Sequence, residues 1–523
     1  MRQRRHRPGF ALEARQRQRI AGQVLRQDLD GDVAAEPAVA GAVHLRPCLR
    51  PPAGPESRKD RGSFLWLMAS ATPGEESSIS DRTCGTIGGA GGAQMRVLMA
   101  VLSLAAGVAA GSEKVTFNKD VLPILQQRCQ ACHRPGEVGP MPLLTYQDAR
   151  PWARAIREAV LIRKMPPWFA ESGHAKLVND PSLSRRQIDT LVAWADGSAP
   201  EGDRKDAPKP VEWVDGWIIG QPDQIFEMPK EFPVPAEGQL EYQHIVVPTG
   251  FREDKWVQAA EVRPGNRPVV HHVIAYVREP GSKWMREAKP GEPFVPRDWS
   301  RGGESVLPAG IVAGFAPGYP PTVLPAGQAI LVKAGSDLVI QMHYTVRGKA
   351  ATDRTKVGLI FAKEPVKQRA VSLAAHNWKF TIPPGAANHR VDSQITFTEP
   401  ATLLAMMPHM HFRGKSFEFR AVYPTGESQI LLRVPRYDFN WQLVYGLETP
   451  LRLPKGTRIE CTAHFDNSTN NPHNPDPTKP VGWGDQTWEE MMIGWMTVAV
   501  DAQANPGRLV KEKRAAPAAV SDF

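Results

Sequence analysis

Cysteine is scarce in this chain. Its 523 residues include five cysteines, of which only Cys129, Cys132 and Cys461 lie beyond residue 111. So few thiols exclude the dense disulfide framework that stabilises many small exported domains. Cys461 lies in an apolar strand pattern, and we interpret it as a small buried hydrophobic residue rather than a metal ligand.

Two other features are missing. The formal net charge is +9, yet no basic helix or basic stripe with interleaved aromatic residues is present, so we expect no nucleic-acid partner. The apolar run that follows Met95 is about a dozen residues long, shorter than the about 20 residues that a transmembrane helix needs. We therefore expect that the chain is not an integral membrane protein.

Proline and glycine, in contrast, are abundant, with 49 and 44 residues. Together with short runs of alternating apolar residues, they predict a β-rich chain with many turns. The length corresponds to about three domains of ~150 residues each.

Residues 95–111 have the organisation of a signal peptide. Met95-Arg96 provides a short basic start, an apolar run follows, and Gly107-Val108-Ala109 offers a small-x-small cleavage site. Residues 1–94 show no sustained helical or strand period, so we expect an overextended start or a disordered segment. The mature chain would then be periplasmic or secreted. The alternative is a buried N-terminal helix.

Cys129-Gln130-Ala131-Cys132-His133 has the spacing of a covalent haem c attachment motif. In such a motif both thiols bond the porphyrin and the histidine ligates the iron. A zinc site would need a second ligand pair nearby, and a thioredoxin-like dithiol would need a βαβ context; the sequence offers neither. We therefore expect haem c on Cys129, Cys132 and His133.

The distal iron ligand is expected downstream of this motif. Met165 lies in a proline-fixed loop after a helical run over 153–162, and His174 is the alternative. The other interpretation of Met165 is a core methionine. A second capped helix is expected over 185–195. The unit thus resembles a class I cytochrome c with His/Met ligation, which implies a small all-α domain.

From residue 213 onward, strand patterns alternate with turns. The expected strands include 242–248, 255–262, 269–277, 329–332, 337–345, 357–361, 391–397, 401–407, 416–423, 428–434, 458–465 and 493–500. We expect 280–325 to be a long surface loop that shapes a cleft. Residues 201–212 have the composition of a linker.

His409 and His411 are two residues apart, so on a β-strand both imidazoles lie on one face and can bind one metal. The alternative is a half-exposed structural pair. His271 and His272 are adjacent, and with His343 they can share a metal only if a bulge or strong twist brings both rings to one side. Otherwise one ring would point inward and the other outward.

Met491 adds a thioether, which next to imidazoles favours copper(I), although a methionine that fills a gap in the core would look the same. Four separated segments occur in a meaningful order: Val270-His271-His272-Val273, Gln341-Met342-His343-Tyr344, His409-Met410-His411-Phe412-Arg413-Gly414-Lys415 and Glu490-Met491. Together they resemble the copper type II, ascorbate-dependent monooxygenases, the family of the peptidylglycine α-hydroxylating and dopamine β-monooxygenases.

The resemblance implies two jelly-roll-like antiparallel sandwich domains with one copper ion each. His271, His272 and His343 would hold an electron-storing copper. His409, His411 and Met491 would hold the catalytic copper that binds O₂. The expected fold is therefore multidomain, with a small all-α cytochrome c domain followed by two all-β domains. The expected segments are 1–94 (overextended or disordered), 95–111 (signal peptide), 113–200 (cytochrome c-like), 201–212 (linker), 213–365 and 366–501 (copper monooxygenase-like β-domains) and 502–523 (disordered tail).

The implied function is an exported copper monooxygenase that hydroxylates a substrate C–H bond with O₂. Electrons would come from an external one-electron donor through the fused haem c. The alternative is a periplasmic haem and copper electron-transfer or copper-binding protein without hydroxylase activity.

Departures from the family pattern concern the substrate. The peptide-amidating members have an Arg, an Asn and a Tyr where this chain has Met407, Ile493 and Trp495. Because this polar clamp is absent, we expect a small apolar or amphipathic substrate instead of a peptide carboxylate.

N-terminal sequencing of the mature protein tests the assigned start. Cleavage after the small residues that end the 95–111 signal is expected to leave a first residue close to Ser112. A mature chain that still contains residue 50 would contradict the assignment.

Overall fold

The computed structural model describes residues 114–296 and 310–512. Residues 1–113, which include the expected signal peptide, lie outside this range. The helices are η1 (Phe117–Val121), α3 (Leu122–Arg128), α4 (Tyr146–Ala149), η2 (Arg150–Trp152), α5 (Ala153–Leu161), α6 (Arg185–Asp196), η3 (Arg204–Asp206), η4 (Arg267–Val269) and η6 (Pro506–Arg508).

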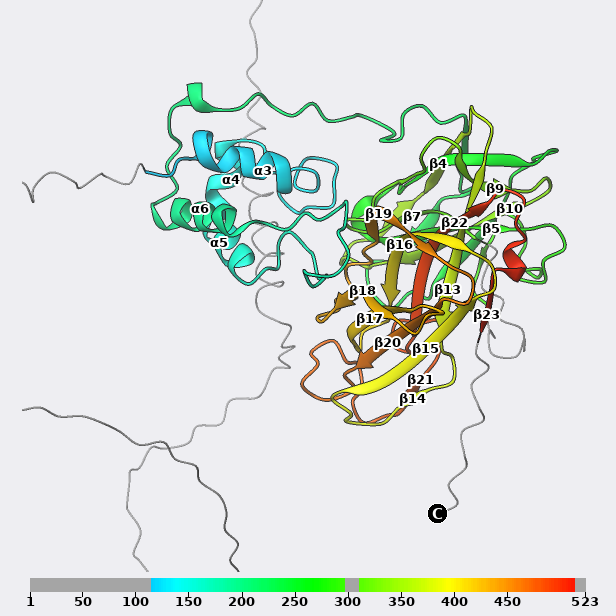
Figure 1. The fold of residues 1–523 in the computed structure, drawn as a ribbon. Helices are drawn as coiled ribbons and strands as arrows, with labels where there is room; N and C mark the ends of the chain where they lie inside the picture. The colour runs from blue at the N-terminus through cyan, green and yellow to red at the C-terminus, as the bar shows by residue number, and fades with distance from the viewer. Residues whose placement is uncertain (1–113, 297–309, 513–523) are drawn as a thin grey trace, which may run out of the picture. The chain divides into compact units, whose positions relative to one another are not determined.

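More of the described residues lie in strands than in helices (Figure 1). Those of the first half are β1 (Gln224–Glu227), β2 (Phe232–Val234), β3 (Gln243–Pro248), β4 (Lys255–Arg263), β5 (Val270–Arg278), β6 (Pro293–Phe294), β7 (Ile311–Phe315), β8 (Thr322–Val323), β9 (Gln328–Val332), β10 (Asp337–Tyr344), β11 (Ala351–Asp353) and β12 (Lys356–Phe361). Those of the second half are β13 (Gln368–His376), β14 (Thr381–Ile382), β15 (His389–Phe397), β16 (Ala401–His409), β17 (Gly414–Val422), β18 (Ser428–Val434), β19 (Tyr445–Leu453), β20 (Arg458–Phe465), β21 (Val481–Gly482), β22 (Ile493–Asp501) and β23 (Val510–Glu512).

The expectation of a small all-α cytochrome c domain is wrong. The described residues hold only short helices before the strands, and the longest, α6, has 12 residues. Prolines and glycines, which disfavour helix, occupy the intervening stretches 129–145 and 162–184, and the chain forms turns there. α6 itself starts where the sequence predicted, because Ser184 and Gln187 form a capping box.

The β-strands pack as stacked sheets around two apolar cores. In the first half, β6-β3-β10-β5-β7 form one sheet, which packs on β12, β4 and β9. In the second half, β18-β17-β20-β15-β23 pack on β13, β22 and β16. β20 shows why its sequence forms such a strand: Ile459, Cys461, Ala463 and Phe465 alternate with more exposed residues, so every second side chain enters the core.

The expectation of two separate jelly-roll-like antiparallel domains is also wrong. One large sheet runs through both halves in the order β1-β12-β4-β9-β13-β22-β16-β19. Its two halves join where β9 and β13 pair in parallel, with Gln328 opposite Gln368 and Ala329 opposite Arg369. No pattern in the sequence indicated this contact, because strand periodicity says nothing about which strands become neighbours.

Some segments expected to be irregular form strands. The expected surface loop 280–325 contains β6, β7 and β8 within its described residues, and β7 pairs with β5. The expected disordered tail contributes β23, which pairs with β15. β19 lies in a stretch with no expected strand and pairs with β16.

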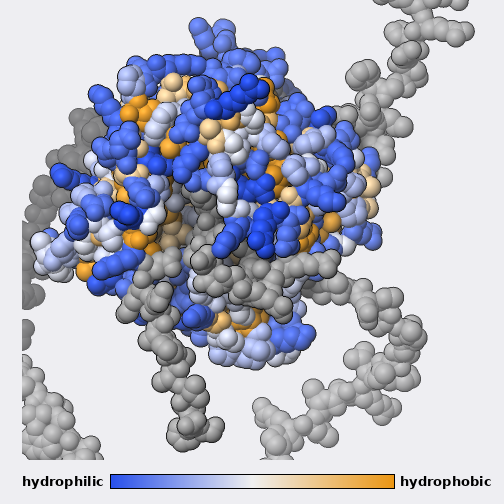
Figure 2. Space-filling view, turned by 90° about the vertical axis from the view of Figure 1, so that its right-hand side faces the viewer, coloured by the Kyte–Doolittle hydropathy of each residue, from blue (hydrophilic) through white to orange (hydrophobic). Residues whose placement is uncertain are grey.

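Cys461 is buried, as predicted, and burial raises the pKa of its thiol. No helix within residues 114–296 and 310–512 is long and apolar enough to cross a membrane. Figure 2 shows one face of the molecule, on which hydrophilic residues prevail and hydrophobic residues appear in small groups.

Gly494 of β22 provides a test of the second core. A Cβ at this position would lie 2.5 Å from the Cys461 sulfur and 2.9 Å from the Phe419 ring. Gly494→Ala is therefore expected to overpack the core and to lower the free energy of unfolding by about 1–3 kcal/mol. Urea unfolding measures the change.

Adding Cys461→Ala removes the sulfur that the new methyl group meets. The double variant is expected to lose less stability than the sum of the two single variants. Additive losses, or a Gly494→Ala variant as stable as the wild type, would contradict this packing.

Candidate metal centres

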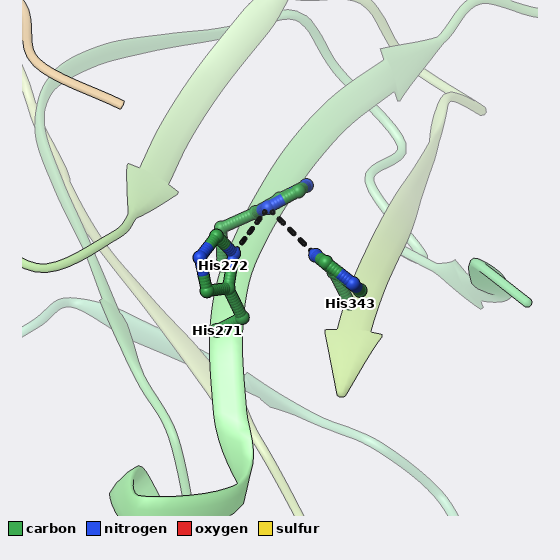
Figure 3. Close-up of side chains that lie close together, drawn as sticks. All are labelled: His271, His272 and His343. Atoms are coloured by element: carbon green, nitrogen blue, oxygen red, sulfur yellow. Dashed lines mark hydrogen bonds between the residues drawn. The ribbon is translucent and has the colours of Figure 1, made fainter. Parts of the chain in front are cut away.

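Three histidines converge where β5 and β10 meet. His272 pairs with His343, but the next pair is Val270 with Tyr344, so His271 bulges out of the ladder. This is the bulge that a shared site for His271 and His272 requires. Figure 3 shows the three side chains, two from β5 and one from β10, directed toward one another.

Two of the nitrogen–nitrogen distances in this three-histidine group match those between ligands of one metal ion. The Nδ1 atom of His272 lies 3.2 Å from that of His271 and 3.3 Å from that of His343, and the ligand nitrogens of the group lie within 4.8 Å of one another. Two nitrogens that bind one ion at about 2.0 Å with tetrahedral angles lie about 3.3 Å apart. A neutral imidazole has one N–H, so three converging Nδ1 atoms are better satisfied by a cation than by each other.

Burial keeps these imidazoles uncharged. It lowers the pKa of His271 to about 4, and it lowers the pKa values of His272 and His343 well below their usual range, with repulsion between the rings as a further cause. The Nε2 atom of His271 is buried without a hydrogen-bond partner. The group therefore offers lone pairs at neutral pH, as a metal ligand must.

His409 and His411 form a second group at the end of β16. Their ring centroids are 5.2 Å apart. The Nδ1 of His411 donates to the carbonyl of Glu489 at 3.2 Å. The Nδ1 of His409 donates to Oε1 of Gln442 at 2.9 Å, and the amide nitrogen of Gln442 donates to Phe439.

These hydrogen bonds decide which nitrogen is free. Because both Nδ1 atoms carry the proton, both Nε2 atoms keep their lone pairs. The Nε2 of His411 is buried and has no hydrogen-bond partner. Burial lowers the pKa of His409 and lowers that of His411 well below its usual range. The pair thus fits a metal bound through Nε2.

Glu490 holds the backbone that carries His411. It is fully buried, and its carboxylate accepts the backbone N–H of His411 at 2.9 Å and that of Arg413 at 2.6 Å. The Arg413 guanidinium lies 4.0 Å from the same carboxylate and also donates to Asn467 and the Trp488 carbonyl. Burial raises the pKa of Glu490 to about 8.

Two aromatic residues connect the two histidine groups. The Tyr242 ring lies 4.6 Å from His343 and 6.4 Å from His411, so these imidazoles are at most 11.0 Å apart. Phe439 stacks on His271 at 5.3 Å and contacts His411 edge to face at 5.9 Å. The two candidate centres are therefore neighbours across one layer of aromatic side chains.

Met491 is half-buried directly after Glu490, and two residues before Ile493, which pairs with His409. Its side chain packs against the apolar group of Met407, Ile493 and Trp495. No hydrogen bond or ring contact of the described residues ties it to His409 or His411, so its role as a ligand stays a prediction.

The Cys129–His133 segment forms a tight turn at the end of α3. The backbone N–H groups of Cys132 and His133 both donate to the Cys129 carbonyl, at 3.1 and 2.9 Å. Both cysteines are free thiols. The His133 Nδ1 donates to the Met141 carbonyl at 3.2 Å, which leaves Nε2 available to a metal, and burial lowers the pKa of His133. These residues fit a covalent haem.

The two candidates for the distal ligand differ in their surroundings. Met165 is half-buried after α5, and its backbone N–H donates to the Ala159 carbonyl. His174 is engaged by the Glu171 carboxylate at 3.0 Å, which makes it less available. No contact of the described residues joins Met165 to His133, so this ligand also stays a prediction.

The turn next to His133 contacts the segment that leads into β5. The Glu137 carboxylate pairs with Arg134 at 3.0 Å and also with Arg267. Arg267 begins η4, directly before the strand that carries His271. Arg267 also lies over the Phe315 ring, 5.6 Å from its centroid.

A second contact involves the chain after Met165. Trp168 packs on Tyr445 at 4.8 Å, the Val178 N–H donates to the Gly446 carbonyl at 3.0 Å, and the Asn179 amide donates to the Val444 carbonyl at 2.6 Å. The loop just before β19 carries Phe439 and Gln442. The haem-motif region is therefore attached to the segments that build both histidine groups.

Sequence reasoning missed four residues of this site: Tyr242, Phe439, Gln442 and Glu490. Glu490 stood inside a recognised motif but received no role. The other three lie far along the chain from the histidines that they contact, and no spacing pattern marked them.

No family model and no curated protein matches the chain. Among solved structures, it is similar to the VP2 subviral particle of infectious bursal disease virus, with a TM-score of 0.17 and 10% identity over 55% of this chain and 74% of that chain. It is also similar to dimeric latent PorU from Porphyromonas gingivalis, with a TM-score of 0.13 and 9% identity over 48% of this chain and 24% of that chain. Such low TM-scores carry no argument, so the resemblance to copper monooxygenases stays a prediction.

Glu490→Gln tests the support of His411. A glutamine has one acceptor oxygen for two backbone N–H donors, and its NH₂ group would face the other donor. The change is expected to weaken copper binding at the His409/His411 group by about 10–100-fold. Copper titration against a competing chelator measures the loss.

Glu489→Gln is the matched control, because only the backbone carbonyl of Glu489 contacts His411. It is expected to bind copper like the wild type. Equal affinities of the wild type and the Glu490→Gln variant would contradict the role given to Glu490.

Proposed function

We propose that the chain is an exported copper-dependent monooxygenase that uses O₂ to hydroxylate a substrate C–H bond. The observation that carries the proposal is the convergence of five largely buried histidines into two neighbouring groups. The Nε2 atoms of His271 and His411 are buried and have no hydrogen-bond partner. Buried polar atoms are normally satisfied, so such unpaired nitrogens call for a ligand.

Copper suits both donor sets. His271, His272 and His343 offer three imidazoles, His409 and His411 offer two, and Met491 is the predicted thioether ligand. Imidazole with thioether favours copper(I). When bound, copper supplies one-electron redox chemistry and O₂ binding.

The residues around the centres orient the ligands and exclude water. Gln442 and the Glu489 carbonyl fix the His409 and His411 rings with Nε2 free. Tyr242 and Phe439 fill the space next to both groups. An environment of this kind prevents side reactions of reactive oxygen species with solvent.

The face beside His409 suits a small apolar or amphipathic substrate. Met407, Ile493 and Trp495 form a buried apolar cluster there. A carboxylate would lose its hydration without gaining a partner from these three side chains.

Cys129, Cys132 and His133 would hold a covalent haem c, with Met165 as the distal ligand. The haem supplies a one-electron carrier within the same chain, and an external one-electron donor would reduce it. The Glu137 contact with Arg267 attaches this turn to the segment before β5, and the Trp168 contact with Tyr445 attaches the chain after Met165 to β19. Export through residues 95–111 would place the protein in the periplasm or outside the cell, where such haem attachment is expected.

One observation favours a second function, a haem and copper electron-transfer or copper-binding protein. The His271/His272/His343 group is complete without Met491, and a pure carrier needs no O₂ site.

Met491→Leu distinguishes the two functions. Changes to residues that only support a metal ligand lower activity by about 10–100-fold. Because Met491 would be a ligand itself, the variant is expected to lower O₂-dependent hydroxylation by more than this. Its haem absorption and its copper at the three-histidine group are expected to persist. The assay follows ¹⁸O₂ incorporation into a panel of small apolar substrates.

Met492→Leu, the neighbouring buried methionine, is the matched control and is expected to keep turnover. A fully active Met491→Leu variant would remove Met491 from the catalytic site. A wild type that incorporates no ¹⁸O from any substrate would favour the electron-transfer function.

A further inference from the structure

A cavity of about 60 Å³ lies against the second half of the large sheet. Its fifteen lining residues include no charged side chain. The floor is formed by β13, β22 and β16, and the opposite wall includes Ile311 of β7 and Tyr319. The cavity therefore lies where the two halves of the chain face each other.

The strand register places this cavity next to the His409/His411 group. Directly opposite residues of antiparallel strands point to the same face, and so do residues two apart on one strand. Ile493 lies opposite His409, and two residues further along, Trp495 lies opposite Met407. We call each such pair of opposite residues a row; the next row on this face is Thr497 with Ala405.

These rows connect the metal ligand to the cavity. His409 belongs to the first row, whereas Trp495, Met407, Thr497 and Ala405 of the next two rows all line the cavity. Rows of a strand are about 7 Å apart. The cavity therefore starts one row away from His409, on the same face of the sheet.

We propose that this cavity is the substrate-binding site and that it takes a small neutral aliphatic molecule. The proposal rests on the monooxygenase function proposed above, whose substrate class it defines. The molecule lies along β22 over Thr497 and Trp495, with one end toward His409.

The lining explains this choice of ligand. Met407, Trp495 and Ile311 provide apolar walls, and the hydroxyl groups of Ser372 and Thr497 can serve one neutral polar group of the ligand. A carboxylate would find no cationic partner among the lining residues. The volume is smaller than the about 150 Å³ of an apolar cavity that binds benzene, so the site favours a short chain or a single compact group.

The test uses the full chain with its metals, labelled with ¹³C at the methionine methyl groups. Xenon and 1-butanol are the probes, and butyrate is the charged counterpart of butanol. Both neutral probes are expected to shift the methyl resonance of Met407 but not that of Met228, which is buried in the first core. Butyrate is expected to bind at least about 10-fold more weakly than butanol, a difference of about 1.4 kcal/mol.

Ala405→Ile fills the cavity, and Thr402→Ile adds bulk on the same strand outside it. Ala405→Ile is expected to abolish the shifts of the Met407 resonance and to raise the KM for the substrate at least about 10-fold. Thr402→Ile is expected to leave these shifts and the KM unchanged. Unchanged shifts in Ala405→Ile, or butyrate binding as tightly as butanol, would overturn the proposal.

The two proposals fail in different ways. If the wild type hydroxylates a substrate while Ala405→Ile keeps its KM and its methyl shifts, the cavity assignment falls and the function stands. If xenon and butanol bind as expected but the metal-loaded protein never incorporates O₂, the monooxygenase function falls and the cavity remains a ligand site.

Discussion

The pairing of β22 with β16 is the constraint on which the site depends. It sets Ile493 opposite His409 and Trp495 opposite Met407, so one face of the sheet carries both a metal ligand and an apolar surface. A shift of one residue would turn His409 into the core and Met407 away from the cavity. The buried Glu490 carboxylate continues this register past the end of β16, because it accepts the backbone N–H groups of both His411 and Arg413.

The second constraint is the burial of uncharged imidazoles. Five histidines lie close together in a region from which water is largely excluded, and protonating any of them would bury a cation beside other polar rings. Burial therefore lowers the pKa of each one. In the His409/His411 group, Nδ1 donates hydrogen bonds, so these neutral rings can bind metal through Nε2. In the His271/His272/His343 group the Nδ1 atoms converge, so these neutral rings can bind metal through Nδ1.

The local elements of the fold could be predicted from the sequence, but their assembly could not. The expected strands around His271, His343, His409 and Met496 match β5, β10, β16 and β22 within two residues at each end. The two halves share one sheet because β9 and β13 pair in parallel. Sequence periodicity predicts where a strand lies but not which strand lies beside it. The expected all-α unit failed because Pro and Gly break the segments between its short helices.

The same division applies to the candidate site. The spacing of His409 and His411 predicted a shared face. A shared site for His271 and His272 required a bulge, and the structure contains one. Tyr242, Phe439 and Gln442 could not be found, because they reach the histidines through contacts between segments far apart in the chain.

Metal analysis of the exported protein, together with its haem absorption spectrum, tests whether the chain holds the proposed metals. We expect two coppers and one covalent haem c per chain. One zinc ion and no haem per chain would rule out the proposed function.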